Sequence, residues 1–205
     1  MGTEMIVGNP SVIAIESRIT CAYERLSFRA LGFFVIHVGG RCYGRRSHDS
    51  TMLACSYDEV ERRIAARGTH SCPLASEADA GQIADAFRNA LYAEKQKTVY
   101  FGVPVEEFVD SIRSSRIVWT PDGDEAFDDG SYVLQFDVGD RVRLIAFRSG
   151  DDWRHDPTTL ADLWLPAHDF YHVLQLWRDG FLSEWESTPK VSMAHDQDSS
   201  ARRFE

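Results

Sequence analysis

The order of apolar and polar residues along the chain predicts strands first, then helices, then a second group of strands and a final helix. Residues 11–22 and 28–38 are rich in β-branched and aromatic side chains, which is typical of strands. Gly39-Gly40 predicts a hairpin turn that leads into a short strand at about residues 41–44. The first part of the chain is therefore expected to form an antiparallel meander with short loops.

The middle of the chain combines helical periodicity with recognisable helix ends. A fourth strand is expected at about residues 51–55, and residues 56–59 (Ser-Tyr-Asp-Glu) have the spacing of a capping box. This box predicts a short helix that runs to about Arg67. Residues 76–79 form a second box that opens a longer helix, and Pro104 begins a third one.

The last part of the chain returns to strands before it ends in a helix. Residues 117–119 predict a strand, and residues 131–138 and 141–148 predict a hairpin closed by a Gly-Asp turn. A final helix is expected from about Pro166, with Gly180 at its end. Together these elements predict an α+β fold with a mostly antiparallel sheet, a meander and a late hairpin, and three to four helices packed on it.

Composition indicates one globular unit. The chain has 205 residues, of which 43% are hydrophobic and 12% aromatic, so it can bury a substantial core. Internal repeats and convincing linkers are absent from the sequence. We therefore expect a single α+β domain over residues 1–186 and a polar, flexible C-terminal tail over residues 187–205.

Charge narrows the classes of partner. The formal net charge is −10, and residues 105–160 alone carry thirteen carboxylates against six arginines. Because nucleic-acid binding requires a basic surface, the balance argues against it and favours a basic protein partner. The sequence has no apolar run long enough for a membrane helix and no secretion signal at its start. We therefore expect no membrane contact and a cytoplasmic location.

The most unusual stretch is the acidic segment between Trp119 and Gly130, which places five carboxylates within nine residues. An unpaired ionised carboxylate is too costly to bury, so these groups must face water, a cation or another protein. Strands on both sides would hold the segment at a defined place on the surface. The candidate partner-binding residues are its carboxylates and the flanking aromatic residues: Asp122, Asp124, Glu125, Asp128, Asp129, Trp119, Phe127 and Tyr132.

The same segment does not match a recognised catalytic or metal-binding pattern. An EF-hand loop starting at Asp122 would require oxygen, glycine and glutamate where Ala126, Phe127 and Val133 stand. A solvated acidic turn is therefore favoured over a calcium site. Consecutive carboxylates in such a turn are mostly hydrated, which also argues against an acid and base pair with separated pKa values.

His168 and His172 have the i, i+4 spacing that a zinc site can use. On the predicted final helix they lie opposite the apolar stripe and so point to solvent. A third ligand and a cleft are not visible in the sequence. The cysteines are widely spaced and form no Cys-x-x-Cys pair, so neither a zinc ribbon nor a redox motif is indicated. We expect no metal and no cofactor.

Several of these segments also carry a resemblance. Residues 5–10 (Met-Ile-Val-Gly-Asn-Pro) with residues 14–16, and then residues 31–36 leading to Gly-Gly-Arg at 39–41, resemble the immunity protein 42 family of bacterial polymorphic-toxin systems. Residues 141–147 are similar to the late hairpin of that family. The final helix from Pro166 also fits, so the resemblance spans roughly residues 5–185.

The resemblance implies a small cytoplasmic protein, not an enzyme, that binds and neutralises a cognate toxin. It supplies no catalytic residue. The expected partner is a basic C-terminal toxin domain, attracted by the acidic segment, anchored on its aromatic residues and inhibited by steric occlusion. If that domain is a nuclease, the carboxylates could mimic phosphates. The alternatives are a metal-dependent hydrolase that uses His168, His172 and loop carboxylates, and a module that only self-associates.

Overall fold

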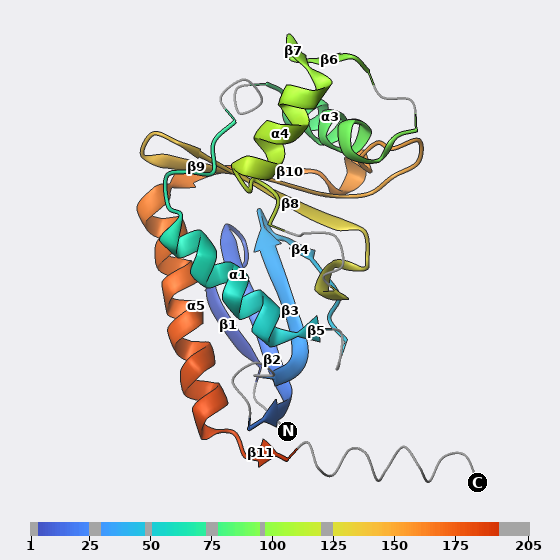
Figure 1. The fold of residues 1–205 in the computed structure, drawn as a ribbon. Helices are drawn as coiled ribbons and strands as arrows, with labels where there is room; N and C mark the ends of the chain where they lie inside the picture. Colours follow the sequence, from blue (N-terminus) through green and yellow to red (C-terminus); the bar gives the residue numbers. More distant parts are fainter. Residues whose placement is uncertain are drawn as a thin grey trace, which may run out of the picture.

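The computed structural model describes residues 4–24, 30–47, 51–72, 78–94, 97–119 and 125–192. Two antiparallel sheets dominate this part of the chain, one standing below the other, and a helical cap covers the far side of the upper sheet (Figure 1). The predicted α+β class is confirmed. None of the described helices is both long enough and apolar enough to cross a membrane.

The first sheet is the predicted meander with an unpredicted strand over residues 5–9 added at its edge. Its main path runs in chain order, each strand antiparallel to the next: β1 (Met5–Asn9), β2 (Ile13–Tyr23), β3 (Ala30–Val38) and β4 (Arg41–Tyr43). The Gly39-Gly40 hairpin is confirmed, because Val38 pairs with Arg41 and both glycines have positive φ. Two short strands complete the sheet: β5 (Thr51–Met52), paired with β3, and β11 (Lys190–Val191), parallel to β2.

The first helix begins earlier than the sequence predicted. Helix α1 (Leu53–Ala65) follows β5 directly, so the predicted strand over residues 51–55 is wrong beyond Met52. Ser56 is buried within the helix and does not cap it. Leu53, Tyr57 and Val60 recur at helical spacing and are all buried, so packing of this apolar face decides where the helix starts.

The second sheet has the order β10-β9-β8. The predicted hairpin is confirmed with its bounds, as β8 (Ser131–Val138) and β9 (Arg141–Arg148), whereas β10 (Ala161–Pro166) was not predicted. Residues 117–119 form only one β-bridge, between Val118 and Leu134. Both faces of this sheet are buried: alternate side chains of β8 and β9 enter two separate apolar clusters.

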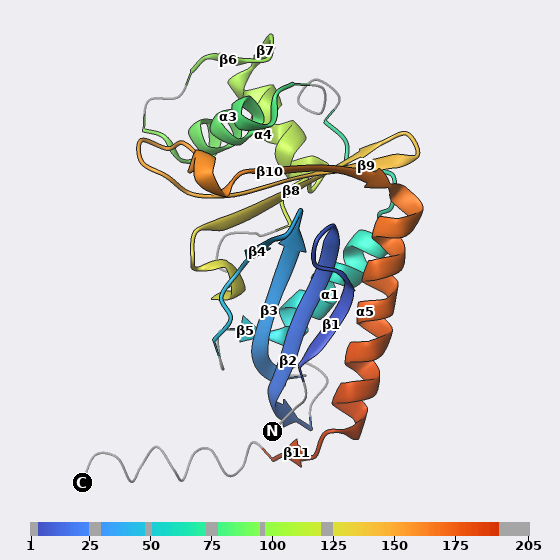
Figure 2. The same cartoon turned by 180° about the vertical axis from the view of Figure 1, so that it is seen from behind.

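Helix α5 (Ala167–Ser187) runs along the first sheet beside α1 (Figure 2). The predicted end at Gly180 is wrong, since the helix continues for seven further residues. Phe181 is fully buried and stacks on Trp177 with ring centroids 5.3 Å apart. The helix therefore continues past Gly180 because Phe181 is buried. Gly180 has no side chain, which leaves room for Met5.

The cap consists of helices α3 (Ala80–Tyr92) and α4 (Val105–Ser114) with a small hairpin, β6 (Val99–Tyr100) and β7 (Val103–Pro104). The start of α4 at Pro104 is confirmed. Helix α3 is capped by Asp79, which accepts a hydrogen bond from the backbone N–H of Gln82. Ser76, the first residue of the predicted capping box, lies outside the described residues. Two 3₁₀ turns, η2 (Glu125–Phe127) and η3 (Pro157–Thr159), flank the second sheet.

Candidate functional site

The described part of the acidic segment is a short turn held by ion pairs. Asp122 and Asp124 lie outside the described residues. Glu125 and Asp128 are exposed, and Asp128 lies 4.0 Å from Arg45. Asp129 accepts a hydrogen bond from the backbone N–H of Ser131 at 3.1 Å, and its other carboxylate oxygen lies 3.2 Å from Nε of Arg148. Asp129 therefore anchors the turn, whereas Glu125 and Asp128 face outward.

The aromatic residues of the segment do not form the exposed anchors that the sequence predicted. Trp119 is 1% exposed and Phe127 is 7% exposed. Trp119 meets Phe170 edge-on at 5.7 Å between ring centroids, and Phe127 meets Phe34 at 6.3 Å. Both rings belong to the apolar cluster between the two sheets, α1 and α5. The acidic residues near them in the sequence had suggested that they were exposed. Tyr132 is half-buried, and its hydroxyl accepts a hydrogen bond from Arg88 at 3.0 Å.

A second acidic turn lies beside the first because β8 begins where β9 ends. Ser131 pairs with Arg148, and the N–H of Ser149 donates to the carbonyl of Gly130 at 2.8 Å. The chain then turns through four exposed residues, Asp151, Asp152, Trp153 and Arg154. We call the exposed carboxylates of the two turns, together with Trp153, the acidic edge: Glu125, Asp128, Asp151, Asp152 and Trp153. The register of the hairpin therefore brings the two acidic turns together.

Trp153 is an exposed aromatic residue on a strained turn. It is 44% exposed, and both it and Asp152 have positive φ, at 58° and 54°. The left-handed conformation costs an ordinary L-residue about 1–2 kcal/mol. His155 fixes the turn, because its Nδ1 lies 2.7 Å from Oδ1 of Asp85 on α3. Strain of this kind and an exposed tryptophan are both typical of binding surfaces.

Trp153 borders a hollow of about 450 Å³ between α3, the β6–β7 hairpin and the turn itself. Val99, which is 51% exposed, and Phe101 lie at the same hollow. Arg88 approaches the Trp153 ring at 5.8 Å, and among the described residues no carboxylate pairs with it. A tryptophan beside a buried arginine is a combination enriched in the energetic centres of protein interfaces.

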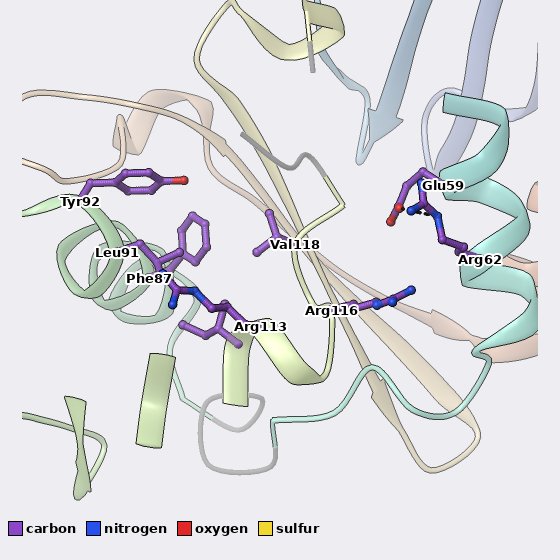
Figure 3. A pocket seen from close by; sticks show the side chains of 9 residues that line it. Glu59, Arg62, Phe87, Leu91, Tyr92, Arg113, Arg116 and Val118 are labelled. Atoms are coloured by element: carbon purple, nitrogen blue, oxygen red, sulfur yellow. Dashed lines mark ion pairs between the residues drawn. The ribbon is translucent and has the colours of Figure 1, made fainter. Parts of the chain in front are cut away.

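A groove of similar volume, about 450 Å³, lies on the other side of α3 (Figure 3). Phe87 and Leu91 of α3 lie on one side, and Glu59 and Arg62 of α1 lie on the other. Arg116 extends between them, just after the end of α4. The groove thus combines an apolar wall with several arginines. The sequence did not single out this pattern because the residues come from three separate segments.

The charge of Glu59 in this groove is neutralised by two arginines of its own helix, Arg62 and Arg63. Its carboxylate lies 2.9 Å from Nε of the fully buried Arg63 and 3.6 Å from Nε of Arg62. Burial lowers the pKa of Arg63 to about 10, and the charge of Glu59 opposes that effect. Arg63 therefore stays protonated at neutral pH. The arginines at the rim of the groove are left with an excess of positive charge.

The four non-glycine residues with positive φ in the described chain all line one of these two hollows. Phe101, Asp152 and Trp153 line the hollow beside the acidic edge, and Arg116 lines the groove. Strained backbone conformations are often found at functional sites, because a strained residue lowers stability and is retained where it serves a function. The two sides of α3 are therefore candidate functional surfaces.

The histidine pair is placed as the sequence predicted. His168 and His172 are both exposed on α5, with parallel rings 6.0 Å apart between centroids. Within the described ranges, no group of three His, Cys, Asp or Glu side chains is arranged to hold a metal ion. A hydrolase that depends on a metal at this pair is therefore not favoured.

Comparisons with known proteins give a family for the chain and a solved structure of similar fold. A family model described as immunity protein 42 matches residues 5–180 of the chain. Among solved structures, the crystal structure of CdiI from Burkholderia dolosa AUO158 is similar, with a TM-score of 0.53 and 16% sequence identity. That alignment covers 86% of this chain and 99% of the other, and at this identity it concerns the fold. A comparison with curated proteins finds no match.

Proposed function

The chain belongs to the immunity protein 42 family, and we propose that it neutralises its toxin by binding the toxin domain directly and covering that domain's active site. The match over residues 5–180 is the observation that carries this proposal, because it spans both sheets and the helical cap. An immunity protein acts by inhibiting a toxin and is not an enzyme. Its partner is therefore a protein.

The partner that the charge favours is a basic toxin domain, which we take to be the C-terminal domain of a larger protein. The net charge of −10 would attract such a domain from a distance. The acidic edge would act at closer range. Asp122 and Asp124, which the sequence also predicts to bind the partner, lie outside the described residues. If the toxin is a nuclease, these carboxylates would occupy positions that nucleic-acid phosphates otherwise take.

Trp153 is the aromatic residue best placed to anchor such a complex. It is exposed beside Asp151 and Asp152, whereas Trp119 and Phe127 are in the core. A rigid aromatic side chain contributes a large contact area at a small entropic cost. We place the complex in the cytoplasm, where a delivered toxin would meet the protein.

The direct test is co-expression of this chain with the toxic domain encoded by the adjacent upstream gene. Host survival and co-purification are read together, and a catalytically inactive toxin variant serves as the control for binding without toxicity. Rescue together with a stable complex supports the proposal. Continued killing by an active toxin, with no complex, would contradict it.

The same preparations separate the two alternatives. A hydrolase that depends on His168 and His172 would bind a stoichiometric metal and lose stability with a chelator. A module that only self-associates would show a mass that rises with concentration and no heterologous partner. Neither behaviour is expected of an immunity protein that works by occlusion.

A further inference from the structure

We propose that the groove between α1, α3 and α4 receives a segment of the toxin in which a carboxylate stands next to an apolar side chain. This inference rests on the proposed function and adds to it the chemistry of one contact. The residues that would make the contact are Arg113 and Arg116, with Leu91 and Val118 as the apolar surface. The groove is separate from the acidic edge, since the two have no residue in common.

Charge is the first observation that supports this occupant. Arg62, Arg113 and Arg116 stand at the groove. Glu59, the one carboxylate among the described residues that line it, pairs with Arg63 and with Arg62. Among the described residues, no carboxylate forms an ion pair with Arg113 or Arg116. Both side chains are exposed. In a protein with a net charge of −10, this is a local positive site that a partner carboxylate would complete.

The apolar wall is the second observation, because a purely ionic ligand would leave it uncovered. Phe87 and Ile112 are each 1% exposed and form the base of the wall, while Leu91 and Val118 are half-buried and reach the groove. Burying an apolar side chain there would displace water from these surfaces and stabilise the complex. A carboxylate with an adjacent apolar side chain therefore fits the groove better than a free anion does.

The backbone of Arg116 is the third observation. Its φ is 47°, and its N–H donates to the carbonyl of Arg113 at 3.2 Å, so it is the residue in left-handed conformation that follows α4. Glycine is the usual residue at such a position, because an L-side chain is strained there. Arg116 carries this strain and has no partner carboxylate among the described residues, which supports a binding role for its guanidinium.

A purely structural role for these arginines makes a different prediction. Cations near the C-terminal end of a helix interact favourably with its dipole, and Arg113 lies in the last turn of α4. If this were their only role, removing the side chains would lower stability and leave toxin affinity unchanged. Arg116→Gly separates the two roles, because it removes the guanidinium and also relieves the backbone strain. A binding role predicts weaker toxin affinity without a loss of stability.

A basic toxin can carry one carboxylate for the groove, because net charge and a single ion pair act over different distances. Net charge acts over the whole approach, whereas at physiological ionic strength a single ion pair acts within about 8 Å. The overall field would bring the basic toxin close, and the groove would then fix its register through one carboxylate. A basic toxin that lacks this carboxylate would meet the arginines without compensation and be disfavoured.

The experiment measures toxin binding and stability in parallel for Arg116→Gly, Arg113→Gln and the double variant. Arg178→Gln on α5, whose guanidinium pairs with Asp179 at 2.8 Å, is the matched control. We expect the dissociation constant to rise about tenfold or more for the double variant, mainly through faster dissociation. Arg116→Gly should melt at the same temperature as the wild type or higher, and Arg178→Gln should bind as the wild type does.

A charge swap identifies the occupant. Individual Asp→Lys and Glu→Lys changes in the toxin domain should include one that weakens binding and is rescued by Arg113→Glu. If the wild type binds and protects but the double variant binds equally well, the groove inference fails while the proposed function stands. Binding of inorganic phosphate at the groove with unchanged toxin affinity would overturn it in the same way. If the wild type neither binds nor protects, the proposed function itself fails.

Discussion

The guanidinium carbon of Arg63 lies 5.0 Å from the ring centroid of Trp119, and both side chains are almost wholly buried. Arg63 also donates from Nη1 to the side-chain oxygen of Gln135 at 2.9 Å and from Nη2 to the carbonyl of Val118 at 2.6 Å. One buried cation thus joins α1 to β8 and to the segment that leads into the acidic turn. The indole ring covers this cation and is unavailable to a partner.

Trp119→Ala should therefore destabilise the protein. Removing a large buried aromatic side chain costs about 3–5 kcal/mol, and here it also uncovers the charge of Arg63. The free energy of unfolding is measured by denaturant titration, with Trp119→Phe as the milder control. A variant that kept its stability and lost only toxin affinity would show that the ring faces the partner after all.

Trp153→Gly should have the opposite profile. Because Trp153 is 44% exposed and has a φ of 58°, glycine relieves strain and the free energy of unfolding should stay equal or rise. Loss of an interface tryptophan should weaken toxin binding about tenfold or more. Leu176→Ala, at an apolar residue of α5 that is 47% exposed, is the matched control for affinity. Equal affinity for Trp153→Gly and the wild type would remove Trp153 from the interface.

Charge reversal at the acidic edge should act on association. Changing the four described carboxylates there to lysine should slow the association rate and flatten its dependence on salt, because long-range attraction is screened by ions. The positions are Glu125, Asp128, Asp151 and Asp152. The control carries the same change in net charge at four exposed carboxylates elsewhere: Glu106, Asp169, Asp179 and Glu186. Equal association rates for the two quadruple variants would mean that net charge alone steers the toxin.

His70 should make stability depend on pH below neutrality. It is 1% exposed, and burial together with the charge of Arg63 lowers its pKa. The hydrogen bond to the carbonyl of Ser115 and the charge of Asp137 oppose this shift only in part. The unfolded chain takes up a proton as pH falls through about 6.5, whereas the folded chain does not, so the free energy of unfolding falls with pH from there. The loss ends once pH passes below the lowered pKa of the folded state.

The measurement for His70 is denaturant unfolding at pH 7.5 and at pH 5.5. Asn at this position can retain the hydrogen bond that Nδ1 makes to the carbonyl of Ser115 at 3.0 Å, but it does not titrate. His70→Asn should therefore lose less stability than the wild type between the two conditions. An equal loss in both proteins would assign the pH dependence to other groups.

The sequence by itself determined the elements whose signals are local. The β8–β9 hairpin has its predicted bounds because alternating strands and a Gly-Asp turn specify each other at short range. The Gly39-Gly40 turn, the start of α4 at Pro104 and the solvent-facing histidine pair on α5 follow from equally local patterns. Net charge and the acidic segment were also readable directly, because they depend on composition alone.

The tertiary structure decided which surfaces are buried and which residues meet. Trp119 and Phe127 stand beside carboxylates in the chain, yet rings from β3 and α5 bury them. Helix α5 passes through Gly180 because Phe181 is buried. The arginine groove and the hollow beside Trp153 are assembled from segments far apart in the sequence. Burial depends on surfaces that distant segments supply, and no pattern within one segment contains that information.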